Sequence, residues 1–165
     1  LTPYDVLRLR RATGFTSEKL LNEYIIVEQE PGEAFPRFYL TMVDDGRDSC
    51  VFVGKEGCAV YEHRPGACRA YPLGRAVSRG NSSKAAEHFV LLREPHCQGF
   101  LTSVRQTPQA YMQDQELLVY NGFNDAVLEI ERGIAKQANI FDPVFRRGGI
   151  EVQIPHKITN GCQVG

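Results

Sequence analysis

Four cysteines in the central part of the chain could do chemistry, and they are separated by 7, 9 and 28 residues: Cys50, Cys58, Cys68 and Cys97. Cysteine thiolates bind zinc, iron and iron–sulfur clusters, attack substrates or pair in disulfides, and neutral thiols fill cores as small hydrophobes. The spacing differs from the C-x2-C pairs of a zinc ribbon, so spacing alone selects none of these roles. All four lie next to expected turns or strand ends, where their sulfur atoms can converge.

Charged and imidazole side chains near these cysteines can support a metal site. Four thiolates around one divalent ion leave a net charge of about −2, which a partly buried site must offset. Arg64 and Arg69 flank Cys68 and can offset that charge by donating hydrogen bonds to sulfur, or they can form ion pairs at the surface. His63 and His96 can ligate or orient a ligand, although a histidine beside a turn more often does neither.

Composition argues against several partners and locations. The net charge of −1 gives no electrostatic reason to expect a nucleic acid. No apolar run approaches the roughly 18 residues of a membrane span, so we expect no membrane partner. Five cysteines cannot all pair within the chain, which favours a reducing compartment, and the sequence therefore predicts a cytoplasmic protein.

The elements that must position the cysteines begin with a predicted pair of helices. Thr2 can cap the first helix, Pro3 suits its first turn, and Gly14 provides its stop signal. A second short helix is expected to begin at Thr16 or Ser17.

Strand patterns surround the first two cysteines. Branched and alternating residues predict strands at 24–28, 37–43 and 88–92, with turn signals between them. Residues 64–83 are rich in Pro, Gly and Ser, so we expect mostly loop there. These patterns predict a small antiparallel sheet with irregular cysteine-bearing loops.

The last third of the chain carries a helical pattern. Residues 107–137 follow helical spacing with a break at Asn121–Gly122, and an apolar stripe is expected to face the core: Tyr111, Leu117, Phe123 and Val127. The predicted fold class is therefore α+β, with an N-terminal helix pair and a C-terminal helical segment. We expect one domain over 1–141 and a tail over 142–165, which has no clear period and contains the isolated Cys162.

A regular hairpin would separate the first two cysteines. If residues 50–61 paired around the turn at 54–57, Val53 would face Cys58 and Cys50 would face Tyr61. Cys50 would then lie roughly 10 Å from Cys58 on the opposite sheet face, beyond the reach of one zinc ion. Three solutions stay open: an irregular segment, two separate sites, or a cluster wider than one ion.

The stretch CVFVGKEGCAVYEHRPGACRAYPLGR closely resembles the core of the zinc- or iron-chelating cysteine-cluster proteins. Their hallmark is C-x-F-L, then a cysteine followed by I-Y-x-x-R-P, then C-R-x-Y/F-P. The three elements start here at Cys50, Cys58 and Cys68, and Val53 replaces the usual leucine. The later HCQGF resembles a downstream element, and the opening LTPYDVLRLRRATGFTSEKLL resembles the preceding helix pair. The likeness spans roughly residues 1–135.

The resemblance implies a ligand set and a cofactor. It implies that zinc or iron, the latter including a 4Fe–4S cluster, is held by four cysteines with two arginines nearby: Cys50, Cys58, Cys68 and Cys97, with Arg64 and Arg69. The family is named after an N-terminal C-x-x-C-x-x-C-C cluster, which these residues lack. Because the chain starts at Leu1 without a methionine, we expect that cluster, with further thiolates, to lie upstream.

Three functions remain to be compared. The first is metal chelation by cysteine thiolates, with the biological role and any protein partner unassigned. The second is a metal-dependent protein-modifying enzyme, because some relatives of the family methylate flagellin lysines. No glycine-rich loop marks a methyl-donor site in this sequence. If the enzyme were instead a zinc hydrolase, Glu62 or Glu94 would be its general base. The third is an interaction module that a metal staples.

Overall fold

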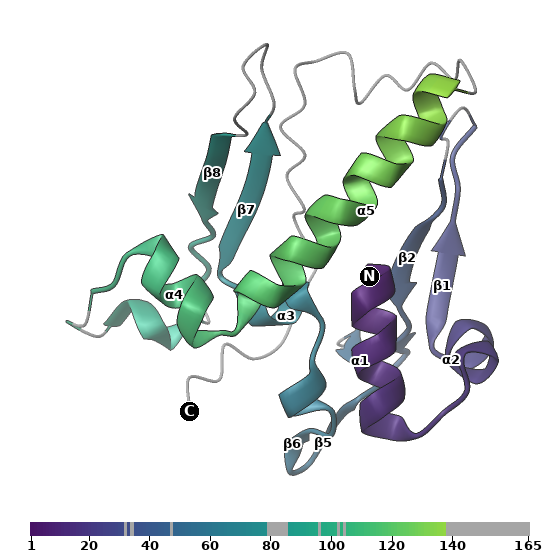
Figure 1. Ribbon diagram of the computed structural model, residues 1–165. Coiled ribbons are helices and arrows are strands. Elements are labelled where there is room, and N and C mark those ends of the chain that lie inside the picture. Colours follow the sequence, from purple (N-terminus) through teal and green to yellow (C-terminus); the bar gives the residue numbers. More distant parts are fainter. Residues whose placement is uncertain are drawn as a thin grey trace. The chain divides into compact units, whose positions relative to one another are not determined.

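The structure is a computed structural model that describes residues 1–137 except 32, 34, 47, 79–85, 96, 102 and 104. Within these residues it is an α+β fold, as predicted, with a helix pair before and a helix pair after four two-stranded antiparallel ladders (Figure 1). The helices are α1 (Pro3–Thr13), α2 (Ser17–Glu23), α3 (Gly66–Ala70), α4 (Pro108–Asp114) and α5 (Leu117–Gln137), with 3-10 turns η1 (Tyr61–His63) and η2 (Gln98–Leu101). The strands are β1 (Ile25–Glu28), β2 (Arg37–Leu40), β3 (Met42–Val43), β4 (Ser49–Cys50), β5 (Val53–Gly54), β6 (Gly57–Cys58), β7 (Leu73–Ser78) and β8 (Ala86–Leu91).

The chain divides into two compact units. Among the described residues, the first contains 1–66 and 119–137, and the second contains 67–118. The predicted tail at 142–165 lies outside the described residues, so the domain boundary at residue 141 stays a prediction.

In the first unit, α1 begins and ends where its cap signals predict. The Thr2 hydroxyl accepts a hydrogen bond from the Asp5 N–H, and the Asp5 carboxylate accepts one from the Thr2 N–H at 2.7 Å. Pro3 occupies the first turn, and Gly14 ends the helix with a φ of 69°. The second helix also begins as predicted, with Thr16 as its cap.

In the first unit, the side chains of Asp5 and Tyr120 pack closely against Gly66. The side chain of Asp5 is 3% exposed, and its Oδ1 accepts a hydrogen bond from the Gly66 N–H at 2.8 Å. A Cβ at Gly66 would lie 3.2 Å from Cδ1 of Tyr120, which is tighter than ordinary van der Waals contact. Tyr120 itself is 1% exposed and donates its hydroxyl to the Arg64 carbonyl at 3.1 Å. A residue without a side chain therefore suits this position.

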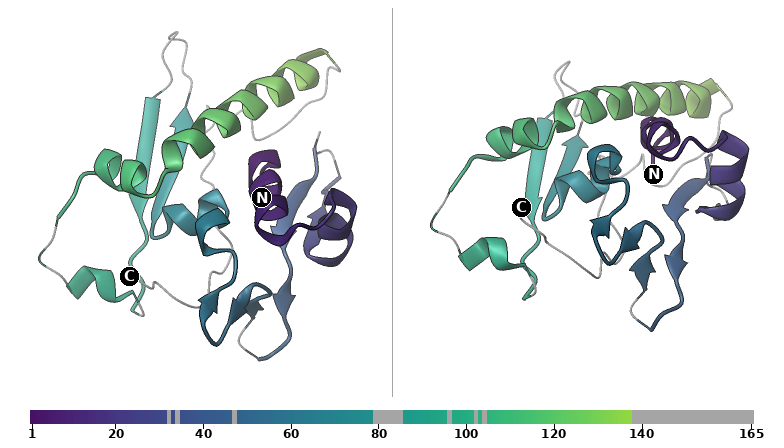
Figure 2. Two further views of the ribbon diagram at one scale, coloured as in Figure 1. Left: turned by 60° about the horizontal axis from the view of Figure 1, so that its bottom comes forward. Right: turned by 90° about the horizontal axis from the view of Figure 1, so that it is seen from below.

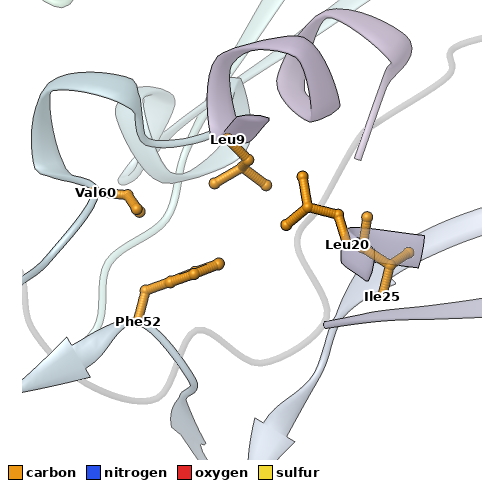
Figure 3. Close-up of a cluster of buried hydrophobic side chains, with 5 residues drawn as sticks. All are labelled: Leu9, Leu20, Ile25, Phe52 and Val60. Atoms are coloured by element: carbon orange, nitrogen blue, oxygen red, sulfur yellow. The ribbon is translucent and has the colours of Figure 1, made fainter. Parts of the chain in front are cut away.

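The hydrophobic core of the first unit joins both N-terminal helices to the cysteine-bearing strands. Figure 3 shows Leu9 and Leu20 from the helices pointing toward Phe52 and Val60, with Ile25 beside Leu20. All five side chains are at most 8% exposed. Because Phe52 and Val60 flank the segment that carries Cys58, this core fixes where that segment lies.

The predicted strand at 37–43 is divided in two. Leu40 pairs with Ile25 in the β1–β2 ladder, whereas Met42 pairs with Cys50 in the β3–β4 ladder. Between them the Thr41 N–H donates to the Tyr24 carbonyl at 2.9 Å. The chain thus changes its pairing partner at Thr41, which a single alternating pattern does not reveal.

In the second unit, β7 and β8 pair along their whole length. The register runs from Leu73↔Leu91 to Ser78↔Ala86, and both views of Figure 2 show the two strands side by side. Strand β8 confirms the prediction at 88–92. The prediction of mostly loop at 64–83 is wrong, because α3 and β7 occupy much of that range. Its prolines mark the starts of elements: Pro65 precedes α3, and Pro72, after a cis peptide bond, precedes β7.

The predicted helical region at 107–137 is confirmed, but its break lies elsewhere. Helix α4 ends at Asp114, Glu116 has a φ of 56°, and Gly122 lies inside α5. Of the predicted core stripe, Leu117 is buried at 2% exposed. Phe123 is 52% exposed and stacks on Tyr4 with ring centres 4.4 Å apart, so its assignment to the core is wrong.

Among the described residues, no helix combines the length and apolar character that crossing a lipid bilayer requires.

Candidate metal centre

Cys50 and Cys58 each end a two-residue strand of the first unit. Cys50 lies opposite Met42 in the β3–β4 ladder, and Cys58 lies opposite Val53 in the β5–β6 ladder. The predicted register of Val53 and Cys58 is therefore confirmed. The pairing of Cys50 with Tyr61 is wrong, because Cys50 takes its partner from another ladder.

A turn at Val51 and Phe52 separates the two ladders. Beyond the Val53↔Cys58 pair, one hydrogen bond continues the hairpin, from the Ala59 N–H to the Phe52 carbonyl at 2.9 Å. The turn then carries the chain out of the ladder before it reaches Cys50. Of the three solutions to the hairpin problem, the irregular segment is observed, whereas two separate sites and a cluster wider than one ion stay predictions.

The Cys50 sulfur lies within electrostatic reach of Cys58. Burial raises the pKa of the Cys50 thiol, a hydrogen bond from the Phe52 backbone N–H lowers it, and negative charge on Cys58 raises it. Both side chains are half-buried and pack against the same hydrophobic core. The structure thus places these two predicted ligands on the same hydrophobic core.

Cys68 and Cys97 lie on two segments of the second unit that Glu94 connects. Cys68 is exposed on α3, whereas Cys97 is 4% exposed in the turn before η2. The Tyr71 hydroxyl, just after α3, donates to the Glu94 carboxylate. The Glu94 carbonyl accepts a hydrogen bond from the Cys97 N–H at 3.0 Å. Glu94 therefore contacts both the end of α3 and the turn that carries Cys97.

Helix α3 is fixed on its other side by α4 and the turn after it. The Arg69 side chain is 4% exposed, and its Nη1 lies 3.1 Å from the Gln115 carbonyl and 3.2 Å from the Glu116 carboxylate. The Tyr111 hydroxyl donates to the Tyr71 carbonyl at 2.6 Å. These contacts also explain why the helical break falls at 115–116 instead of Gly122, since a buried arginine holds that turn.

Arg64 makes contacts with its own 3-10 turn. Its guanidinium carbon lies 3.9 Å from the centre of the Tyr61 ring, and its Nη1 donates to the Tyr61 carbonyl at 3.2 Å. His63, in the same turn, has a buried Nδ1 without a hydrogen-bond partner among the described residues. His96 and Cys162 lie outside the described residues, and the roles of Arg64 and Arg69 toward a thiolate stay predictions.

The sulfur atoms of the four candidate ligands are the type of donor that suits a soft metal ion. No disulfide joins any two of the four cysteines within the described part of the chain. Across the same residues, no three or more His, Cys, Asp and Glu side chains gather as a complete metal site. The first unit offers two half-buried cysteines that pack on one core and one N–H directed at a sulfur, and thiolate sulfur is a donor that both zinc and iron accept.

The sequence did not reveal two of the contacts that build this region. The Phe52 N–H as a donor to Cys50 depends on the turn at 51–52, which the expected regular hairpin excluded. The bond between Tyr71 and Glu94 joins residues 23 positions apart, and no local pattern pointed to it. The Tyr-Pro pair after Cys68 was the available signal that this tyrosine has a fixed place.

Comparison with known proteins assigns the chain to a family. No curated protein and no solved structure matches it. A family model named CxxCxxCC, described as "Putative zinc- or iron-chelating domain", matches residues 1–98, more than half of the 165 residues, and the matched part includes all four candidate ligands. The chain therefore belongs to the CxxCxxCC family of zinc- or iron-chelating domains.

Proposed function

We propose that the protein binds zinc or iron through cysteine thiolates, with Cys50 and Cys58 as one pair of ligands and Cys68 and Cys97 as the other. One observation carries the proposal: the Cys50 sulfur accepts the Phe52 N–H and lies within electrostatic reach of Cys58. Membership of a chelating family supports it.

The surroundings of Cys50 suit a thiolate only when a cation is present. Without one, burial and the neighbouring Cys58 charge raise the pKa of the Cys50 thiol and so disfavour the thiolate. A bound divalent ion supplies the positive charge that stabilises both thiolates. The hydrogen bond from Phe52 then orients the Cys50 sulfur and spreads its negative charge.

The second pair is proposed from its chemistry and from the motif that carries it. Cys68 begins the string C-R-x-Y-P, and the Arg69 and Tyr71 of that string make the contacts that fix α3. This support concerns the segments that carry the two cysteines. One shared ion and two separate ions are the two possible arrangements of the pairs. The number of ions per chain distinguishes them.

Metal analysis of the full chain, purified without oxygen, tests the proposal. Elemental analysis is expected to find zinc or iron in stoichiometric amount. A colourless zinc protein and a brown protein with charge-transfer absorption distinguish a zinc site from an iron–sulfur cluster. Protein that contains neither metal, and that takes up neither when reduced and supplied with zinc or ferrous salts, would overturn the proposal.

Serine variants identify the ligands. Cys50→Ser and Cys58→Ser are each expected to lower the metal content by at least tenfold, because a hydroxyl is a poor ligand for these ions. Cys68→Ser and Cys97→Ala test the second pair in the same way. Cys162→Ser is the matched control and should retain the full metal content. Equal loss in the control would show that the assay reports a general effect of thiol removal.

A further inference from the structure

Two structural features of the Cys50–Cys58 pair suit the formation of a disulfide bond. Both thiols pack on one core, and the backbone path between them folds back twice, at residues 51–52 and 55–56. We infer that Cys50 and Cys58 form a reversible disulfide when a hydroperoxide reacts with the metal-free protein. The consequence for metal retention rests on the function proposed above, whereas the disulfide itself does not.

The backbone geometry suits such a bridge. Cys58 lies directly opposite Val53, and opposed residues of an antiparallel ladder have Cα atoms roughly 4.5–5.5 Å apart. The turn at 51–52 spans Cys50 to Val53, and the ends of a β-turn lie within about 7 Å. A disulfide requires Cα atoms about 4.4–6.8 Å apart. Val53 is thus a near neighbour of both cysteines, and a bridge between them requires the turn at 51–52 to adjust so that the two sulfur atoms meet.

The strands that carry the two cysteines can make that movement at low cost. The β3–β4 and β5–β6 ladders each contain two residue pairs. Val53 is 48% exposed, and a Cβ at Gly54 would meet no atom within 4 Å. Segments with short ladders and few buried contacts open with small free energies. The core side chains Phe52 and Val60 stay as anchors while the turn adjusts.

The chemistry balances with one hydroperoxide for each disulfide. The thiolate of one cysteine attacks the peroxide oxygen, the O–O bond breaks, and a sulfenic acid and an alcohol, or water, are formed. The second thiol attacks that sulfur, the S–S bond forms, and the hydroxyl leaves as water. Two thiols are oxidised and one peroxide is reduced. A thiol reductant reverses the step by thiol–disulfide exchange.

Loss of two ligands gives the reaction a consequence for the metal. Neither sulfur of a disulfide is a thiolate, so the pair can no longer neutralise a divalent ion. Peroxide would therefore convert a metal-binding pair into a covalent cross-link at the same place, and reduction would restore the binding pair.

Peptide mapping of the metal-free full chain tests the disulfide. Trypsin cuts after Arg47, Lys55 and Arg69 but not between Arg64 and Pro65, so Cys58 and Cys68 stay on one peptide. The experiment therefore uses the Cys68→Ser chain, in which peptide 48–55 contains only Cys50 and peptide 56–69 contains only Cys58. After treatment with hydrogen peroxide, we expect the two peptides linked, two hydrogen atoms lighter than their sum, and separated by a reductant. Further substitution Cys50→Ser should abolish this species.

Three outcomes overturn the inference: peptides that stay separate, cysteines that pass directly to sulfinic acid, or bridges that run only to Cys97 or Cys162. A second measurement on the wild-type metal-loaded chain follows metal release with a chromogenic chelator during peroxide treatment, and release is expected in step with disulfide formation. A chain that binds metal but forms no disulfide defeats this inference alone. A chain that forms the disulfide but never binds metal defeats the proposed function alone.

Discussion

Cys50 and Cys58 are separated by 7 residues and are positioned by backbone ladders. Cys68 and Cys97 are separated by 28 residues and are related through the Tyr71 side chain, which donates to the Glu94 carboxylate, and the Glu94 carbonyl, which accepts from the Cys97 N–H. The first pair is half-buried on a shared core. In the second pair one cysteine is exposed and the other is buried. The first arrangement depends on apolar packing beneath two turns. The second depends on polar contacts that fix a five-residue helix.

The difference predicts which substitutions affect which pair. Changes in the core below residues 50–60 should act on the first pair, and changes in the contacts of α3 should act on the second. A substitution that affected both pairs equally would mean that the two regions are not separable in this way.

The largest effect is expected from Phe52→Ala. Phe52 is 8% exposed, and its ring stacks on Tyr24 at 5.5 Å between ring centres. Truncating a buried phenylalanine costs about 3–5 kcal/mol of the free energy of unfolding. Urea unfolding of the reduced, metal-free chain measures this loss. Phe52→Leu is the matched control, which keeps most of the buried volume and should lose much less. An unchanged midpoint for Phe52→Ala would contradict the role given to this core.

A smaller effect is expected from Arg69→Ala in the second unit. Its buried guanidinium satisfies the Gln115 carbonyl and pairs with Glu116, so its removal leaves a carbonyl without this donor and should cost about 2 kcal/mol. The expected result is weaker retention of metal by Cys68 and Cys97, with the peroxide-formed Cys50–Cys58 bridge unchanged.

Glu116→Gln is the control for that prediction. The Glu116 side chain is 67% exposed, so its ion pair should contribute less than about 1 kcal/mol. If Glu116→Gln lowered the free energy of unfolding as much as Arg69→Ala does, the turn at 115–116 would depend on the exposed ion pair and not on the hydrogen bond from the buried guanidinium.

Tyr71→Phe is expected to cost about 1 kcal/mol, because it removes only the hydroxyl that donates to Glu94. Thermal unfolding measures the loss, and metal analysis should show faster release from the second pair than from the first. Tyr61→Phe is the control, since Tyr61 is 46% exposed and its ring contact with Arg64 survives the change. Equal release from both pairs in Tyr71→Phe would remove the distinction between them.

The smallest effect concerns pH in the metal-free chain. Burial raises the pKa of the Cys50 thiol above the unfolded value of about 8.5. The unfolded state therefore loses this proton at lower pH than the folded state does. The corresponding stability is fully present below pH about 8.5 and is lost as the pH rises through the folded pKa. Urea unfolding from pH 7 to 10 should show a shallower decline for Cys50→Ala than for the wild type, and parallel curves would contradict the assignment.

Local signals predicted the parts of the fold that local forces determine. Helix α1 followed from Thr2, Asp5 and Gly14 because a cap acts within a few residues. The Val53–Cys58 register followed from the turn between them. The partner change at Thr41 and the turn at 115–116 depend on distant strands and on a buried arginine, so no short window contained them.

The candidate site was predictable in its residues and only partly in its geometry. The resemblance supplied all four cysteines, whereas the adjacency of Cys50 and Cys58 required the turn at 51–52, which alternation of side chains cannot indicate. The glycines and prolines after residue 64 were misread as loop, because the same residue types begin elements when tertiary contacts support the chain.

The absence of a side chain at residue 66 has a practical consequence for anyone who transplants this motif. An aromatic ring and a carboxylate that are far apart in the sequence, Tyr120 and Asp5, meet the backbone at that glycine. A grafted copy of R-P-G-A-C-R would need a host that offers an equally close-fitting hollow and an acceptor for the same N–H. Without them, the grafted segment would have the same sequence but would not adopt the same conformation.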